Sequence, residues 1–176
     1  MQTDVLVAIL VLIFTDITIH TAGTNIRVFV NQFEPLWRYK TTHRGHHRCV
    51  VDRLVSVRPL SITFNRCLFL GASRCDLRIL GVLDTQHRDR MTLFHRDTFR
   101  AVERVLFVAI DDSCAVFKVE SLTDWHHEYY DLRVRNSSVH TRPILACQTY
   151  FKRVIGQQPS FYVYHPECQR LIREEN

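Results

Sequence analysis

The sequence is poor in glycine and proline, with five of each among its 176 residues. This low content excludes collagen-like chains and glycine-rich repeats. Its longest apolar run has ten residues, whereas a membrane-spanning helix needs about 20. Hydrophobic residues (46%) and charged residues (23%) are in ordinary proportion, which excludes a disordered chain. The length predicts one domain, and the 11 Phe, 6 Tyr and 2 Trp are sufficient for a large core.

Motifs of catalysis are also missing. The sequence has no Gly-x-Ser-x-Gly, no glycine-rich phosphate loop, no His-Glu-x-x-His and no nucleic-acid-binding signature. His43, His46 and His47 lie close together, as do His126 and His127, but without the spacing of a metal site. We therefore predict a protein that is not an enzyme and has no cofactor, no metal and no nucleic-acid partner, and we interpret the histidines as parts of solvated loops.

The ten-residue apolar run occupies residues 5–14 and suits the core of a secretory signal peptide. Small residues follow at 21–23, where cleavage would occur. The expected basic residues before the run are absent and Asp4 stands there instead, so a membrane anchor and a buried strand are the alternatives. We predict a signal peptide over residues 1–23 and one secreted, extracellular domain over 24–176, without a membrane partner after cleavage.

The predicted mature chain keeps all six cysteines, at positions 49, 67, 75, 114, 147 and 168. An even number behind a signal peptide predicts a disulfide framework, although six cysteines allow 15 pairings. Asn136 begins a glycosylation sequon, Asn136-Ser137-Ser138, which agrees with secretion. Without residues 1–23 the net charge rises from +5 to +7, since that segment holds two Asp and no Lys or Arg.

Short β-rich runs separated by turn residues follow one another through the middle of the chain. They occupy residues 61–70, 76–83, 91–94, 105–110, 114–120 and 129–135, with a last run at 161–164. This spacing predicts an antiparallel sandwich or barrel.

One helix is predicted over residues 143–155. Pro143 suits the first turn, and Gly156 suits the C-terminal cap. Five residues recur on one face at helical spacing: Ile144, Cys147, Phe151, Val154 and Ile155. We expect this face to pack on the outside of the sheet.

The alternation within two strands bears on function. In residues 114–120, Ala115, Phe117 and Val119 share one face. In residues 129–135, Asp131 and Arg133 share the face opposite Leu132. Either the apolar face turns inward and the charges are solvated, or the helix covers the apolar face and the charges enter a cavity.

Five short sequence elements, in their order along the chain, are similar to those of a known family. They are residues 35–42 (PLWRYKTT), 114–117 (CAVF), 130–133 (YDLR), Cys147 followed by Tyr150 and Phe151, and 164–169 (YHPECQ). In order and spacing they resemble the secreted tick salivary lipocalins, the family that includes the histamine-binding proteins. The resemblance extends over about residues 33–169.

The resemblance implies an all-β fold, an eight-stranded antiparallel up-and-down lipocalin barrel with a C-terminal α-helix packed outside. It also implies two disulfides, Cys49–Cys168 and Cys114–Cys147. Cys67 and Cys75 each stand four residues from Gly71, and a hairpin turning there would bring them face to face. We predict a third bridge between them, with two free thiols or exchange with a partner chain as the alternatives.

In the histamine-binding members two inward carboxylates hold the amine. Here the first of the two elements reads Cys114-Ala115-Val116 and lacks its carboxylate. Asp131 replaces the second carboxylate with a shorter reach, and Arg133 replaces an aromatic residue. A guanidinium pairs with carboxylates and phosphates, so this substitution favours an anionic lipid. Asp52 and Glu103 are further carboxylates that a second amine pocket could use.

The predicted ligand-binding residues are Asp131, Arg133, Trp37, Tyr39, Phe64, Phe94, Phe107 and Phe117. The alternative for Trp37 is a structural plug at the barrel floor, and for the phenylalanines it is plain core.

Taken together, the sequence predicts a monomeric, secreted protein that sequesters a host mediator in its cavity and so counters inflammation. The mediator is histamine, another biogenic amine, or a lipid mediator such as a leukotriene. The alternative is a barrel scaffold whose outer surface binds a host protein such as a complement component, and a weaker third candidate is an extracellular polyanion binder.

Overall fold

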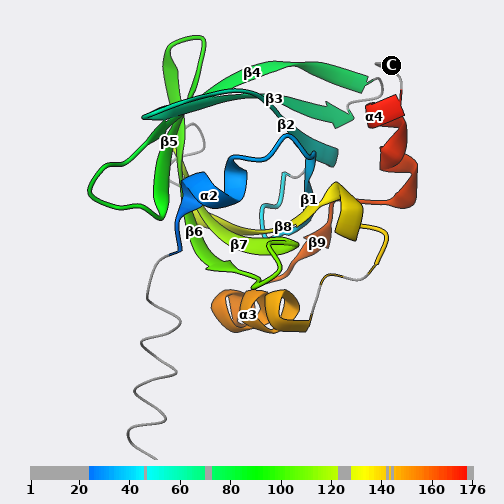
Figure 1. Ribbon diagram of the computed structural model, residues 1–176. Helices are drawn as coiled ribbons and strands as arrows, with labels where there is room; N and C mark the ends of the chain where they lie inside the picture. The colour runs from blue at the N-terminus through cyan, green and yellow to red at the C-terminus, as the bar shows by residue number, and fades with distance from the viewer. Residues whose placement is uncertain are drawn as a thin grey trace, which may run out of the picture.

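The computed structural model shows a nine-stranded antiparallel sheet whose first eight strands close into a barrel (Figure 1). It describes residues 24–45, 47–69, 73–122, 128–141, 143 and 145–173, and only the backbone of residues 73–76, 171 and 173. The predicted signal peptide therefore lies outside the described residues. The barrel strands are β1 (Leu36–Thr41), β2 (Arg48–Arg58), β3 (Ser61–Phe69), β4 (Ser73–Leu83), β5 (Arg90–His95), β6 (Thr98–Val108), β7 (Cys114–Ser121) and β8 (Glu128–Arg135).

Consecutive strands pair from β2 to β8, and β1 closes the barrel by pairing with both β8 and β2. The pairing of β1 with β2 covers only Leu36 and Trp37. Beyond them, β9 (Phe161–Tyr162) takes the place of β2, with Lys40 opposite Tyr162. This up-and-down order confirms the predicted fold class.

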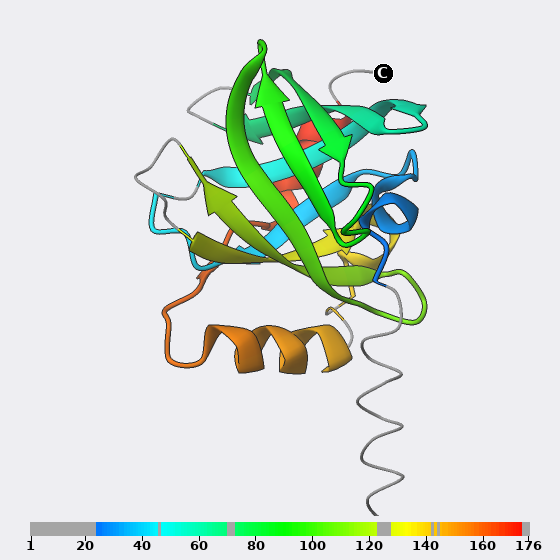
Figure 2. The same ribbon diagram turned by 90° about the vertical axis from the view of Figure 1, so that its left-hand side faces the viewer.

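The helix α3 (Leu145–Ile155) runs along the outside of the barrel (Figure 2). Its residues Cys147, Phe151 and Ile155 are buried against the outer sides of β6, β7 and β8. The predicted helix and its packing face are confirmed, although α3 begins two residues later than predicted and Ile144 lies outside the described residues. The Cys114–Cys147 disulfide, with an S–S distance of 2.04 Å, ties α3 to β7.

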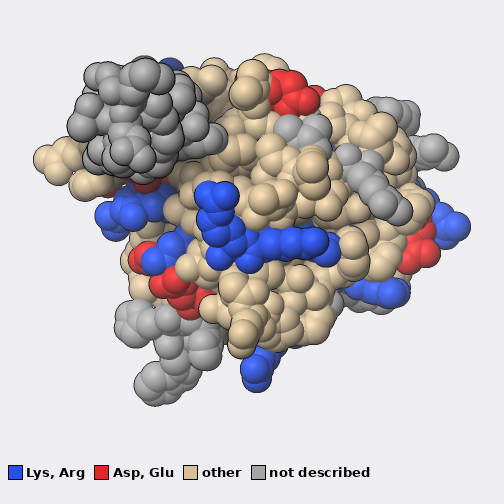
Figure 3. All heavy atoms as spheres, turned by 90° about the horizontal axis from the view of Figure 1, so that it is seen from below, with Lys and Arg blue, Asp and Glu red and all other residues tan. Residues whose placement is uncertain are grey.

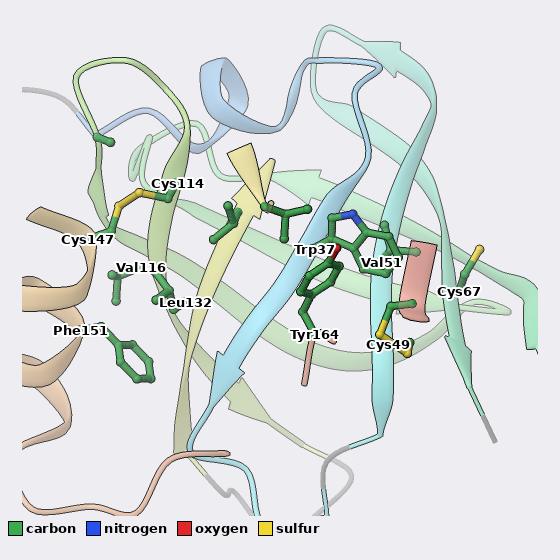
Figure 4. Close-up of a cluster of buried hydrophobic side chains, with 14 of the residues drawn as sticks. Trp37, Cys49, Val51, Cys67, Cys114, Val116, Leu132, Cys147, Phe151 and Tyr164 are labelled. Atoms are coloured by element: carbon green, nitrogen blue, oxygen red, sulfur yellow. A yellow bond between two sulfur atoms is a disulfide. The ribbon is translucent and has the colours of Figure 1, made fainter. Parts of the chain in front are cut away.

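The C-terminal segment covers a second part of the outer surface. It comprises η2 (Pro166–Gln169) and α4 (Arg170–Arg173), and the Cys49–Cys168 disulfide attaches it to β2. The last strand ends at Tyr162, two residues earlier than predicted. Just beyond it, the Tyr164 ring packs edge-on against Trp37, with 5.1 Å between the ring centroids (Figure 4).

Trp37 has no exposed surface and belongs to a cluster of buried side chains on the outer side of the barrel wall, the outer cluster, which also includes Val134, Phe151 and Tyr164. Leu36 faces the barrel interior, so its neighbour Trp37 points to the opposite side. The indole Nε1 donates a hydrogen bond of 2.9 Å to Asn136 Oδ1, at the start of η1 (Asn136–Ser138). Trp37 is thus structural, but it closes the outer wall and does not plug the barrel floor. Glycosylation of Asn136 remains a prediction.

The third bridge also remains a prediction. Cys67 is completely buried, whereas the side chain of Cys75 lies outside the described residues. The pairing of β3 with β4 places Leu68 opposite Arg74 and Phe69 opposite Ser73. The register shifts between Arg66 and Leu68, so the pairing is irregular at Cys67 itself. Cys67 and position 75 still lie on neighbouring paired strands, as a cross-strand bridge needs.

Strand β2, the helix α2 (Ile26–Val30) and the short helical segments η1, η2 and α4 were not predicted from the sequence. Helix α2 precedes β1 and is capped by Asn25, whose side chain accepts a hydrogen bond from the Arg27 amide. Ile26 and Phe29 are buried to about 1% exposure and pack inside one end of the barrel. Five residues show too little periodicity to identify a helix from sequence. No helix in the described ranges is long and apolar enough to cross a membrane.

Candidate ligand-binding site

Strand β8 turns its charged face into the barrel. Asp131 and Arg133 have exposed fractions of 0% and 2%, whereas Leu132 and Val134 join the outer cluster with Cys147 and Phe151 of α3. The helix therefore covers the apolar face of β8, and the charges point inward. The alternation allowed two arrangements, and the structure has the one in which the helix covers the apolar face and the charges enter the barrel.

The inward charges belong to a network that crosses the barrel. Three guanidiniums and three carboxylates form it: Arg38, Arg66, Arg133, Asp52, Glu103 and Asp131. Each comes from an inward-facing strand position, as Arg66 does between the inward side chains of Phe64 and Leu68. Equal numbers of opposite charges allow such a group to be buried, since an unpaired buried charge is very costly.

Arg133 is at the centre of the network. Its Nη1 and Nη2 donate hydrogen bonds of 2.7 and 2.6 Å to the two oxygens of Glu103, and Nη2 donates a third of 3.1 Å to Asp131. The guanidinium also lies over the Phe117 ring, 4.3 Å from its centroid. All of these partners are buried, so Arg133 is held in place by the barrel, and both amino groups of its guanidinium already bond to carboxylates.

Arg66 and Arg38 complete the network on the side of the barrel mouth. Arg66 donates bonds of 2.7 and 2.8 Å to the two oxygens of Asp52 and lies 3.4 Å from Glu103 Oε1. Arg38 Nε lies 2.9 Å from Asp131 Oδ2, so the two side chains form an ion pair, but the N–H group does not form a hydrogen bond with that oxygen. Among the described residues, the two terminal amino groups of Arg38 form no hydrogen bond.

The network shifts the proton affinities of its members. Burial alone would raise the pKa of Glu103, but the charge and hydrogen bonds of Arg133, then the charges of Arg66 and Arg38, outweigh it and lower the pKa to about 2. Burial would lower the pKa of Arg133, but Glu103, Asp131 and Asp52 raise it above its ordinary value. Glu103 and Arg133 are therefore both charged at every physiological pH.

On one side of the network the barrel is filled. Phe29 of α2 packs against Phe117 with 5.9 Å between the ring centroids, and Arg135 donates a bond of 2.6 Å to the Phe29 carbonyl. The space that remains beside Phe64 and Arg133 measures only about 20 Å³. That volume is enough for about one water molecule. We call this half the closed end.

On the other side lies the mouth cavity, of about 470 Å³. Such a volume is typical of a small-molecule site. Its wall is formed by the apolar side chains Val50, Leu68, Leu77, Ile79, Leu93, Ala101 and Val119. Its floor is the network, represented by Arg38, Arg66 and Glu103, with Tyr129 beside them. His43, His47, His95 and Arg100 lie around the rim.

The charges that reach this cavity are mostly positive. Arg38 and Arg66 keep 10% and 15% of their side-chain surface exposed, whereas Glu103 keeps none. Glu103 is also fully engaged by Arg133. The cavity can therefore accept a ligand with an apolar body and an anionic group, and among the described residues it offers no carboxylate that lacks a guanidinium partner.

The predicted ligand-binding residues lie elsewhere. Asp131 and Arg133 are beneath the cavity floor, and Phe64 and Phe117 are in the closed end. Trp37, Tyr39 and Phe107 are on the outer side of the barrel wall, and Phe107 stacks on Tyr150 of α3 at 4.8 Å. Phe94 also faces outward, where it contacts Phe99 at 5.8 Å.

The sequence contained a signal for Arg66, which was not among the candidates, and for the inward orientation of Glu103, which was named only for a second amine pocket. Arg66 shares its strand face with Phe64 and Leu68, and Glu103 shares its face with Ala101 and Val105, so both stand on otherwise apolar faces. The expected solvated histidines His43 and His47 lie at the rim, whereas His46, His126 and His127 lie outside the described residues. Within the part that the structure describes, no three His, Cys, Asp or Glu side chains cluster as metal ligands.

No protein-family model matches the sequence, and no curated protein matches it significantly. The structure, in contrast, is similar to several solved ones. The AM182 serotonin complex has a TM-score of 0.61 at 20% identity, over 77% of this chain and 84% of that chain. H1 crustacyanin from the lobster Homarus americanus has a TM-score of 0.59 at 11% identity, over 89% and 87%. The siderocalin Ex-FABP, described as having dual ligand specificities, has a TM-score of 0.55 at 9% identity, over 74% and 87%. At these identities the likeness concerns the fold, and the fold of this chain is that of the lipocalins.

Proposed function

We propose that this protein is a secreted carrier that holds one small ligand in the mouth cavity and lowers the free concentration of that ligand. The observation that carries the proposal is the cavity itself, with about 470 Å³, an apolar wall and a floor of guanidiniums. One similar barrel is a serotonin complex and another is described as having dual ligand specificities, which supports small-ligand binding as the role of the fold. The two disulfides fit an oxidising, extracellular compartment.

Of the two ligand classes that the sequence left open, the cavity favours an anionic lipid mediator such as a leukotriene over histamine or another amine. An amine in an apolar pocket needs a carboxylate partner, and the carboxylates of the network are already paired with arginines. The anion partner that we propose is Arg38, and not Arg133 as the sequence suggested. Arg38 lines the cavity, whereas Arg133 is held beneath it by Glu103. Removal of the mediator from host tissue would counter inflammation.

The test is equilibrium binding of leukotriene B4, serotonin and histamine to the oxidised mature chain and to two variants. Arg38→Gln removes the proposed anion partner. Arg58→Gln removes the same charge from the exposed end of β2, far from the mouth, and is the matched control. We expect Arg38→Gln to weaken leukotriene binding by about tenfold, the value of one charge-assisted hydrogen bond, and Arg58→Gln to leave it unchanged. Tighter binding of either amine than of the leukotriene would reject the anionic class, and equal effects of both variants would reject Arg38.

A second candidate function is the scaffold that binds a host protein such as a complement component. The observation in its favour is the outer side of β4 to β6, where Leu80 and Phe99 are 38% and 36% exposed. A shallow hollow of about 360 Å³ lies there beside Leu80 and Phe94. Absence of any one-to-one adduct with the three ligands in a native mass spectrum would favour this scaffold over the carrier.

A further inference from the structure

A groove on the outside of the barrel has features of a second binding site, independent of the mouth cavity. It lies between α3 and the edge where β9 pairs with β1, and its volume is about 260 Å³. The buried side chains of Leu132 and Phe151 form its apolar floor. One side is formed by Tyr39, Lys40 and Tyr162, and the other by residues of α3 that include Lys152.

An irregularity of β1 makes this groove basic. Arg38 is opposite Arg133 inside the barrel, but the register shifts by one residue before Lys40, which is opposite Leu132. Leu132 faces outward, so Lys40 does as well. Regular alternation would instead place Lys40 inside with Arg38. The bulge therefore brings Lys40 to the same groove as Lys152.

Within the described residues neither Lys40 nor Lys152 has an ion-pair partner, and none of the groove residues is a carboxylate. Figure 3 shows the molecule from below, the side on which α3 lies in Figure 1, with Lys and Arg side chains across the middle of that face. Two like charges beside one hollow attract an anion that interacts with both.

The groove also contains aromatic surface. Tyr39 and Tyr162 meet edge to face, with 5.7 Å between the ring centroids, and Tyr162 is 53% exposed. The Lys40 ammonium lies 4.0 Å from the centroid of the Tyr162 ring, which fixes a positive charge beside that ring. A ligand ring that contacts this pair over the floor of Leu132 and Phe151 would bring its own substituent to the lysines.

We propose that this groove binds a small aromatic anion, a ring that carries a sulfate or a carboxylate. The lysines would interact with the anionic group, and the tyrosine pair and the apolar floor would contact the ring. The site is separate from the mouth cavity, because the barrel wall of β1 and β8 lies between them. Its occupation therefore does not depend on the proposed carrier function.

The experiment is an NMR titration of the mature chain with four probes. Phenyl sulfate and benzoate carry both ring and charge, phenol carries the ring alone, and inorganic sulfate carries the charge alone. We expect saturable shifts of the Leu132 methyls and the Tyr162 amide with phenyl sulfate or benzoate, and much weaker ones with the other two. The tighter of the two aromatic anions identifies the anionic group. Shifts confined to the Leu93 and Val119 methyls would place the probe in the mouth cavity and overturn the proposal.

Three variants sharpen the test. Lys40→Gln and Lys152→Gln should each weaken binding by about threefold, as expected for an exposed ion pair. Arg153→Gln removes the same charge from the neighbouring residue of α3, whose guanidinium lies 6.0 Å from the Tyr150 ring and is not part of the groove. This control should bind like the wild type. Equal losses in all three variants would show general attraction to a basic surface and would overturn the site.

Discussion

The two ends of this barrel are built from the same strands and differ in what occupies them. At the closed end α2 inserts Ile26 and Phe29, and only about 20 Å³ remains. At the mouth a cavity of about 470 Å³ remains open above the charge network. The comparison teaches that an eight-stranded barrel does not by itself fix a ligand site. A five-residue helix and a network of six charges, four of them buried, decide where the space lies.

The network should have the largest effect, because it separates the two ends. Arg133→Met leaves Glu103 without its bidentate partner in a buried position. We expect the free energy of unfolding to fall by about 4 kcal/mol, since breaking a buried ion pair leaves an uncompensated charge. Urea unfolding at pH 7 measures this loss. Arg100→Met, the same change at the exposed rim, should cost no more than about 0.5 kcal/mol, and a similar cost for both variants would contradict a structural role of the network.

The Phe29 ring of α2, which fills the closed end, can be removed without changing the charge network. Phe29→Ala removes the ring that packs on Phe117, and we expect a loss of about 3 kcal/mol in the free energy of unfolding. The variant should also gain a cavity between Phe117 and the Arg135 guanidinium, which lies 4.5 Å from the Phe29 ring centroid, so benzene should stabilise it against heat but should not stabilise the wild type. Val28→Ala in the same helix is 59% exposed and serves as the control. If benzene stabilised the wild type equally, the closed end would not be filled.

The low pKa of Glu103 predicts how stability depends on pH. A carboxyl group whose pKa falls from 4.5 to about 2 on folding stabilises the protein above pH 4.5 and loses this contribution as the pH falls toward 2. Between pH 7 and pH 3 the wild type should lose about 2 kcal/mol through Glu103, and Glu103→Gln should lack this part of the decline.

Urea unfolding at several pH values measures the difference between the two proteins. The carboxyl carbon signal of Glu103 in the wild type gives an independent reading, because it should not begin to shift until the pH is below 3. A shift centred near pH 4.5 would contradict the network's charge pattern.

The mouth can be filled with little change in stability. Ala101 lines the cavity, and Ala101→Phe would extend a ring into it. We expect ligand binding, measured with leukotriene B4, to weaken by at least about tenfold, which corresponds to about 1.4 kcal/mol. Val102→Phe places the same ring on the other side of β6 and should bind normally. Normal binding by Ala101→Phe would mean that the ligand does not occupy the mouth.

Much of the architecture could be read from local patterns. Short β-rich runs between turn residues predicted most of the barrel strands, and the recurrence of Cys147, Phe151 and Ile155 predicted the face of α3. The resemblance implied the pairings Cys49–Cys168 and Cys114–Cys147, and both bridges are present. For the site, Asp131 and Arg133 face inward, whereas the other candidates pack in the closed end or on the outer side of the barrel, and a role of any of them in ligand binding remains a prediction.

The sequence by itself determined which residues could share a face, because neighbouring strand residues alternate and helical residues recur every three to four positions. Only the tertiary structure decided which face was interior, since that depends on where α2, α3 and the C-terminal segment dock. It also decided the partners of each charge. Nothing near Arg133 in the sequence indicates a partner for its guanidinium, but folding brings Glu103, 30 residues away, into a hydrogen bond with it. Folding also leaves Arg38 at the floor of the cavity. Long-range pairing of this kind has no local signal, because it depends on the register of the whole barrel.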